Sequence, residues 1–214
     1  MQFAKSLRNG DDMESKIIRM AAMNLTGRLN RYAGKSGLEL RKLELGMEIA
    51  LINVSKLAVV YLLALLLGVV VQTFIVSLAF AATKRYSFGL HALNSTVCTL
   101  VSCLMLVVVP WALQGVGISN IAVMVMFVPI VVCLYLYAPA DTNARPLVGP
   151  KNRARLKKKA VAIGVVLMLV ALVVPSGDVK LLIVLGVVLQ CVAIMPLSYK
   201  ILRRRGRNYE QFEC

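Results

Sequence analysis

Histidine and acidic side chains are scarce in this chain of 214 residues, which has one histidine and ten aspartates and glutamates. A single histidine, with no CxxC pair and no His/Asp/Glu cluster at ligand spacing, argues against a metal site. The Walker phosphate loop, the GxSxG nucleophile elbow and the HExxH zinc motif are also missing. The five cysteines are an odd number, so no disulfide framework is predicted. We therefore expect neither a metal nor a cofactor.

Apolar residues, in contrast, make up 59% of the chain. Soluble domains are nearer about 45–50% apolar. The excess lies in continuous blocks of about 20 residues, the length that crosses a bilayer as a helix. A transmembrane barrel would instead alternate apolar and polar residues. The sequence predicts an all-α, polytopic membrane protein.

The formal net charge of +15 comes mainly from lysines and arginines in the segments between the apolar blocks. This placement is typical of the positive-inside rule and of contact with anionic lipids, so we expect membrane lipids and no nucleic acid as partners. The first 45 residues are mostly polar and carry both charge signs, so no cleavable leader is expected.

The number of spans follows from length and charge. Residues 46–83 are too long for one span at about 1.5 Å per residue, which favours two spans, or a re-entrant pair, joined near Gly68. The remaining spans are predicted at about 96–113, 118–138, 159–174 and 179–198. About six transmembrane or re-entrant helices would place every basic segment, and both termini, in the cytosol.

Three regions are expected on this basis. They are a cytosolic N-terminal segment (1–45), a transmembrane domain (46–199) with cytosolic loops at 84–95 and 139–158, and a basic cytosolic tail (200–214). In the first region, apolar residues repeat at steps of three and four, which predicts an amphipathic helix: Ile18, Ala22, Leu25, Leu29 and Tyr32. This helix either lies on the membrane surface or packs on the protein's own cytosolic face.

The polar stretch 84–98, KRYSFGLHALNSTVC, contains His91 and Cys98. A thiolate is a strong nucleophile, and a neighbouring imidazole can take its proton. Residues seven apart on one helix are separated by about 10 Å, whereas a hydrogen bond needs about 3 Å, so a turn between the two is predicted. With Asn94 or Ser95 as N-cap, Cys98 would lie in the first turn of a helix, where the helix dipole favours the thiolate.

Simpler explanations of the same residues stay open. Cys98 fits a small buried side chain, and His91 fits a polar anchor at the membrane interface. Lys56, inside the first span, either extends its ammonium to the interface or marks a functional site, as in a small transporter. The basic residues before 159 are also accounted for by lipid contact and topology alone.

The string RYSFGLHALNSTVC resembles the Arg…Gly-Gly-x-His-Ala…Cys signature of the accessory gene regulator protein B family. Two further stretches agree with that family, LELGMEIALINVSK before the first span and YAPADTNARPL after the fourth. The resemblance covers roughly residues 38–200. It implies a multi-pass protein of the bacterial cytoplasmic membrane, acting as a cysteine endopeptidase on the precursor of a cyclic quorum-sensing peptide.

The resemblance also implies roles for individual residues. Cys98 matches the nucleophile and His91 its base, while Arg85, Gly89 and Asp141 match motif positions. We expect Asp141 either to orient His91 or to pair with Arg85. The basic run is a candidate contact for an acidic tail of the precursor: Lys151, Arg153, Arg155, Lys157, Lys158 and Lys159.

One position departs from the signature, because Phe88 stands where the family commonly has the first of two glycines. Glycine allows backbone angles that phenylalanine resists, which questions the local loop geometry. A homodimer would let His91 and Cys98 pair across subunits, and their spacing leaves this open. The alternative functions are a non-enzymatic membrane peptide exporter or scaffold, and a small transporter.

Overall fold

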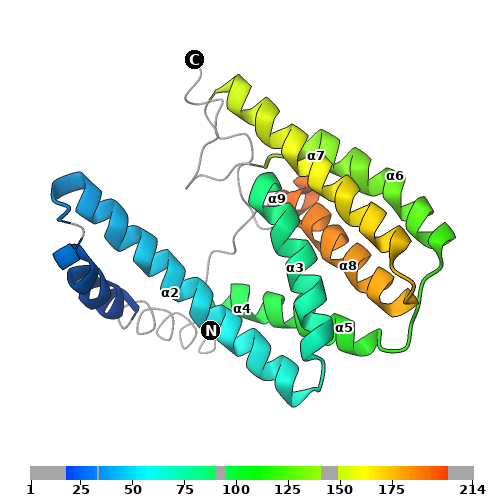
Figure 1. The fold of residues 1–214 in the computed structure, drawn as a ribbon, viewed down its shortest axis with the longest axis horizontal. Helices are drawn as coiled ribbons and strands as arrows, with labels where there is room; N and C mark the ends of the chain where they lie inside the picture. Colours follow the sequence, from blue (N-terminus) through cyan, green and yellow to red (C-terminus); the bar gives the residue numbers. More distant parts are fainter. Residues whose placement is uncertain (1–17, 33, 90–94, 141–148, 202–214) are drawn as a thin grey trace. The chain divides into compact units, whose positions relative to one another are not determined.

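The computed structural model describes residues 18–32, 34–89, 95–140 and 149–201, which are helical apart from short connectors and one isolated β-bridge. Residues 18–32 form a first helix (Figure 1). The elements that follow are α2 (Gly37–Leu66), α3 (Val70–Ser87), α4 (Ser95–Cys103), a π-helical segment (Leu104–Val108), α5 (Val109–Ala112), α6 (Asn120–Tyr137), α7 (Pro150–Val173), α8 (Gly177–Ile194) and α9 (Pro196–Ile201). The chain divides into two compact units, residues 1–63 with 93–103 and residues 64–92 with 104–214.

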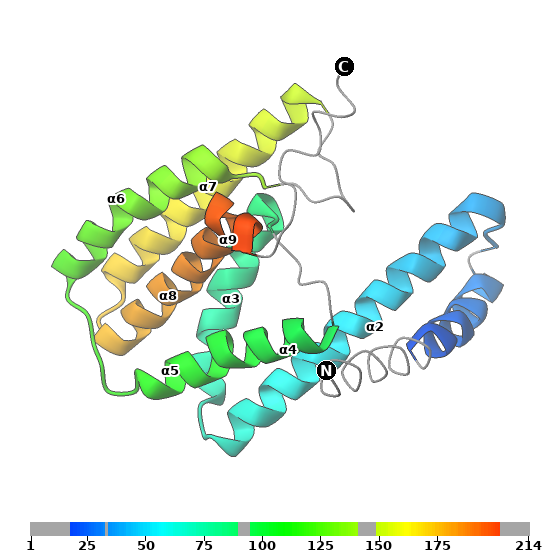
Figure 2. The same cartoon turned by 180° about the vertical axis from the view of Figure 1, so that it is seen from behind.

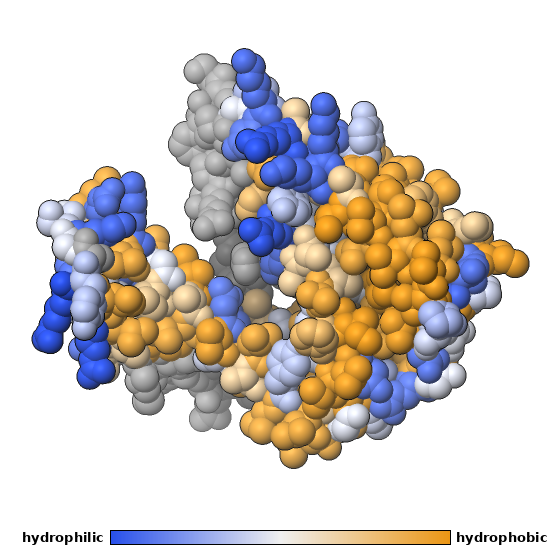
Figure 3. All heavy atoms as spheres, in the orientation of Figure 1, coloured by the Kyte–Doolittle hydropathy of each residue, from blue (hydrophilic) through white to orange (hydrophobic). Residues whose placement is uncertain are grey.

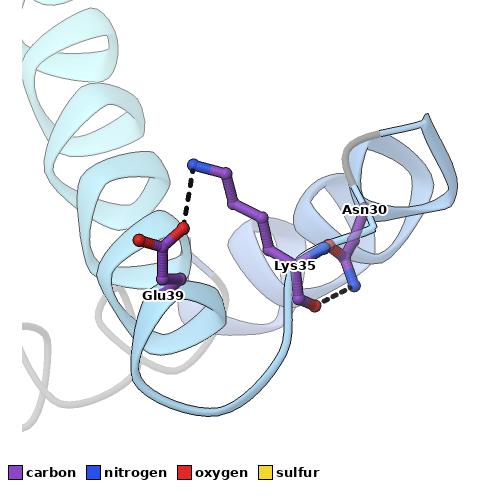
Figure 4. Close-up of polar contacts among 3 residues, drawn as sticks. All are labelled: Asn30, Lys35 and Glu39. Atoms are coloured by element: carbon purple, nitrogen blue, oxygen red, sulfur yellow. Dashed lines mark hydrogen bonds and ion pairs between the residues drawn. The ribbon is translucent and has the colours of Figure 1, made fainter.

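A short polar connection joins residues 18–32 to α2 in the first unit (Figure 4). The Asn30 side chain donates to the Lys35 carbonyl at 2.9 Å and accepts from its N–H at 2.8 Å. Lys35 also pairs with Glu39, in the first turn of α2, at 3.6 Å. The backbone turns at Gly34 and Gly37, both at positive φ, where glycine is favoured.

The predicted apolar stripe on the first helix is only partly buried. Ala22 is buried together with Thr26, whereas Leu25 and Leu29 are exposed and Tyr32 is 94% exposed. An apolar face open to its surroundings is compatible with a helix lying on a membrane, and that placement stays a prediction.

Three of the described helices are long and apolar enough to cross a membrane, α2, α6 and α8. The predicted turn near Gly68 is confirmed, because α2 ends at Leu66 and Gly68 has φ +70° just before α3 begins. The six predicted spans correspond in order to α2, α3, the run from α4 through the π-helical segment to α5, α6, α7 and α8, but the number that cross the membrane stays a prediction.

The second unit is a bundle of α3, α6, α7 and α8 (Figures 1 and 2), in which α8 contacts each of the other three. Its core is built from side chains of α6, α7 and α8, including Val123, Leu134, Met168, Val184 and Val187. The α3 and α8 backbones come close at Gly186, where a Cβ would lie 2.7 Å from the Cβ of Ala79. Small residues permit such close approach between membrane helices.

Many large apolar side chains on the outside of this bundle are exposed, among them Ile121, Val128 and Val173. Figure 3 shows an apolar surface over α6 and α7, with hydrophilic side chains toward the two ends of the bundle. A soluble protein would cover such a surface, whereas lipid tails solvate it.

The ends of the bundle differ in composition. At one end the connectors before α6 and α8 meet, where the Ile118 N–H donates to the Gly177 carbonyl at 3.2 Å and Lys180 donates to Asn120. At the other end lie the last turn of α3, the end of α6 and the start of α7. The described parts of the two predicted cytosolic loops therefore lie at one end of this bundle, and the side of the membrane that this end faces stays a prediction.

The basic run belongs to a helix rather than to a loop. Helix α7 begins at Pro150, inside the predicted loop 139–158 and ahead of the span predicted from 159. Proline is favoured in the first turn of a helix, where its missing N–H would have no intrahelical partner. Of the predicted tail 200–214, only residues 200 and 201 lie in the described part of the chain.

Candidate functional site

Helix α3 ends at Ser87, and the two residues after it have backbone angles that suit glycine. Phe88 has φ 56° and ψ −127°, and it is the only non-glycine residue with positive φ in the described part of the chain. Gly89 follows with φ +113°. Helix α3 therefore ends before His91, and the predicted turn between His91 and Cys98 stays a prediction because residues 90–94 lie outside the described part of the chain. The departure at Phe88 changes the residue type, while the backbone keeps a conformation that glycine favours.

Two polar stretches of the sequence, 84–98 and 138–159, come together at Phe88 and Ala140. The Gly89 N–H donates to the Ala140 carbonyl at 3.2 Å, and the Ala140 N–H donates to the Ser87 carbonyl at 2.9 Å. These bonds pair Phe88 with Ala140 in a parallel bridge. The motif segment that leads toward His91 and the one that leads toward Asp141 therefore start side by side.

Gln190 of α8 forms hydrogen bonds to the α3 side of this pair of segments. Its Nε2 donates to Ser87 Oγ at 2.7 Å and to the Phe88 carbonyl at 2.6 Å, and its side chain is fully buried. We call residues 87–89, residues 138–140 and Gln190 the polar junction. Gly89 is packed against the same helix, where a Cβ would lie 3.2 Å from Ile194 Cγ2.

Cys98 lies in the first unit, as the fourth residue of α4, and its thiol is free and half-buried. Its carbonyl accepts a hydrogen bond from Ser102 Oγ at 2.8 Å. His91, Asp141 and the predicted cap Asn94 lie outside the described residues. The pairing of His91 with Cys98 and the role of Asp141 therefore stay predictions.

Arg85 and the basic run lie at the junction end of the second unit. Arg85 is exposed in the last turn of α3. The Lys157 ammonium lies 4.1 Å from the centre of the Tyr135 ring, and that of Lys159 lies 5.5 Å from the Tyr86 ring. Cations above aromatic faces are attracted by the ring electrons. The rest of the run, Lys151, Arg153, Arg155 and Lys158, lies on the first turns of α7.

This end carries cations and no acidic side chain among the described residues of the second unit, where Asp178, at the other end, is the only acidic residue. The excess of positive charge makes this end a surface that attracts anions, whether lipid headgroups or acidic peptide segments. Across the described residues, no group of three or more His, Cys, Asp and Glu side chains could hold a metal ion.

Sequence reasoning missed Gln190. The signal was present, because Gln190 is the one strongly polar residue in the apolar run 181–194. Polar side chains inside a span are costly and usually functional or paired. Its partners are 102 and 103 residues away in the chain, so the sequence could not name them.

The architecture and the exposed apolar surfaces define a helical membrane protein with a polar junction at one end of its bundle. The chain belongs to the accessory gene regulator B family, whose model matches residues 22–194.

A putative AgrB-like protein of Clostridium acetobutylicum is 40% identical over 94% of this chain and 96% of the relative. One of Listeria monocytogenes serotype 4a is 45% identical over 80% of the chain and 84% of the relative. The accessory gene regulator protein B of Staphylococcus intermedius is 34% identical over 79% of the chain and 89% of the relative. No solved structure matches the chain.

Proposed function

We propose that this protein is a membrane-embedded cysteine endopeptidase that removes the C-terminal tail of a quorum-sensing pro-peptide and closes the remaining peptide into a thiolactone or lactone. The observation that carries the proposal is the position of Cys98. It is a free, half-buried thiol in the first turns of a helix, within the segment that matches the family. A free thiol in this segment is the group that a cysteine endopeptidase uses as its nucleophile.

The reaction takes two acyl transfers. In the first, the Cys98 thiolate attacks the scissile carbonyl carbon, the peptide C–N bond breaks, and His91 gives its proton to the leaving amine. The tail departs and the precursor is left as a thioester on Cys98. In the second, a thiol or hydroxyl of the bound peptide loses its proton to His91 and attacks the thioester. The Cys98 thiolate leaves, and the ring closes.

Water competes with the second step, because hydrolysis of the thioester would release a linear peptide. Exclusion of water therefore decides whether the product is cyclic. Ring closure also benefits from holding the attacking group near the thioester, since the step is then effectively unimolecular. Asp141 is proposed either to orient His91, as the third group of a catalytic triad does, or to pair with Arg85.

The basic run is proposed to attract an acidic tail of the precursor at the cytosolic face of the membrane. The support is the excess of cations on the first turns of α7. Two of these cations also stand above exposed or half-exposed tyrosine rings. Lipid headgroups would bind the same charges. Precursors with a neutral tail distinguish recognition of the tail from binding of lipid. A tail without acidic residues should be cut more slowly if the run recognises the tail.

Cysteine variants give the direct test. The substrate is the peptide encoded by a short reading frame next to the gene of this protein, and the two are co-expressed. This peptide should contain an amphipathic helix, a core with an internal cysteine, and an acidic tail. Cys98→Ala and His91→Ala should abolish release of the tail while leaving the protein in the membrane. Cys103→Ala is the matched control, because Cys103 is also free and half-buried, at the end of the same helix.

Retained cleavage in Cys98→Ala would refute the proposal. Lys56→Met separates the transporter alternative, because Lys56 lies within the candidate span α2. Loss of peptide export in Lys56→Met with unaltered cleavage would assign transport to this chain. Loss of both activities in Cys98→Ala, with Lys56→Met unaffected, supports the endopeptidase.

A further inference from the structure

Gln190 is a fully buried amide on the most deeply packed helix of the second unit. Its only bonds in the described part of the chain leave from Nε2, to Ser87 Oγ and the Phe88 carbonyl. Its Oε1 has no hydrogen-bond partner among those residues. Burying an amide with one end unsatisfied is unfavourable, so packing of α8 does not explain glutamine at this position.

The orientation of the amide follows from its partners. A carbonyl oxygen can only accept, so the NH₂ group must face Phe88. The Ser87 hydroxyl donates to the Thr83 carbonyl at 2.8 Å and therefore accepts from Gln190. At position 190, leucine would have no hydrogen-bond donor. Asparagine would have a donor, but its side chain is one methylene shorter than that of glutamine.

The bonds from Gln190 fix a backbone that would otherwise relax. A non-glycine residue stays in the conformation of Phe88 only where the surroundings over-determine it. The Phe88 N–H donates to the Lys84 carbonyl at 2.9 Å, and the Phe88 carbonyl is held by Gln190. The N–H of the same peptide group, which belongs to Gly89, donates to the Ala140 carbonyl at 3.2 Å. Gln190 is thus the side chain that fixes the carbonyl side of this peptide group.

We propose that Gln190 is a positioning residue of the cleavage site. By holding the Phe88 carbonyl, it sets the direction in which the chain leaves α3, in the segment that carries His91 two residues after Gly89. This inference rests on the proposed endopeptidase function, and Gln190 acts through the backbone rather than on the substrate.

Gln190→Leu tests the inference in full-length protein in lipid nanodiscs. We expect tail release to slow by about 10- to 100-fold, because small displacements of a catalytic group have effects of this size. Hydrogen exchange at the Gly89 and Ala140 amides should become faster. Thr73→Val is the control. Like Gln190, Thr73 is fully buried and has an unpartnered polar atom among the described residues, but it lies near the start of α3, away from Phe88. It should change neither measurement.

A second background separates positioning from general stability. In Phe88→Gly the backbone reaches its native angles without strain, so it depends less on the bond from Gln190. Gln190→Leu should therefore slow tail release less in the Phe88→Gly background than in the wild type. An equal loss in both backgrounds would overturn the positioning role.

Failure of the two proposals can be told apart. Unchanged exchange at Gly89 and Ala140 in Gln190→Leu overturns the inference, whatever the cleavage result. Wild-type rates of tail release in Gln190→Leu overturn it as well. If the wild type and Cys98→Ala release the tail equally, the endopeptidase function fails, and the exchange data still report whether Gln190 holds the junction.

Discussion

The backbone of Phe88 predicts that glycine is more stable than alanine at this position, the reverse of their usual order inside a helix. At φ 56° and ψ −127° a side chain crowds the backbone, whereas glycine does not meet this crowding. Comparing Phe88→Gly with Phe88→Ala removes the ring in both proteins, so the two differ almost only in backbone preference.

The expected difference follows from two opposing effects. An unfavourable conformation of this kind costs a non-glycine residue about 1–3 kcal/mol. Alanine, in turn, has less unfolded-state entropy than glycine, which is worth about 0.4–1 kcal/mol. The free energy of unfolding of Phe88→Gly should therefore be about 1 kcal/mol higher than that of Phe88→Ala. In a protein of this size that raises the Tm by about 2–4 °C.

Thermal unfolding in detergent micelles measures this difference, and Tyr86 supplies the control. Tyr86 lies two residues earlier, inside α3, where glycine is less stable than alanine by about 0.5–1 kcal/mol. Tyr86→Gly should thus melt below Tyr86→Ala. If Phe88→Ala melts at or above Phe88→Gly, as at Tyr86, the reasoning about the Phe88 backbone is wrong.

Three further predictions concern packing, a buried bond and topology. Gly186→Ala should lower the free energy of unfolding by about 1–3 kcal/mol, because its Cβ would lie 2.7 Å from the Val76 carbonyl, and a chemical denaturation series checks this. Asn120→Ala should destabilise by about 1–3 kcal/mol by removing the acceptor of the buried Lys180 ammonium. The loss should shrink in the Lys180→Met background, and equal losses would show that the bond contributes nothing. A thiol reagent that cannot cross membranes should label Cys98 only after permeabilisation, and labelling in intact cells would contradict the cytosolic placement.

Much of the helical content was predictable because it depends on local properties of the chain. Continuous apolar blocks predict helices, and the turn near Gly68 followed from a run too long for one span. The helix that carries Cys98 was expected from the apolar run behind it. The start of α7 at Pro150 was not predicted, because the basic residues before 159 were assigned to the loop 139–158, whereas Pro150 begins the helix.

The polar junction depends on which helices are neighbours, and hydropathy does not contain that information. Helices that are apolar on most faces show no single stripe to say which side meets a partner. The meeting of Phe88 with Ala140 was therefore beyond sequence reasoning, as was the bond from Gln190 to a carbonyl 102 residues away.

The sequence by itself determined a helical membrane protein with basic segments between its apolar blocks, one histidine, and a cysteine behind a polar stretch. These properties follow from composition and from spacing along the chain. Only the tertiary structure decided that the two polar stretches start from one junction, and that a buried glutamine on α8 holds it. The physical reason is that a hydrogen bond between distant residues depends on how helices pack, which local residue patterns do not specify.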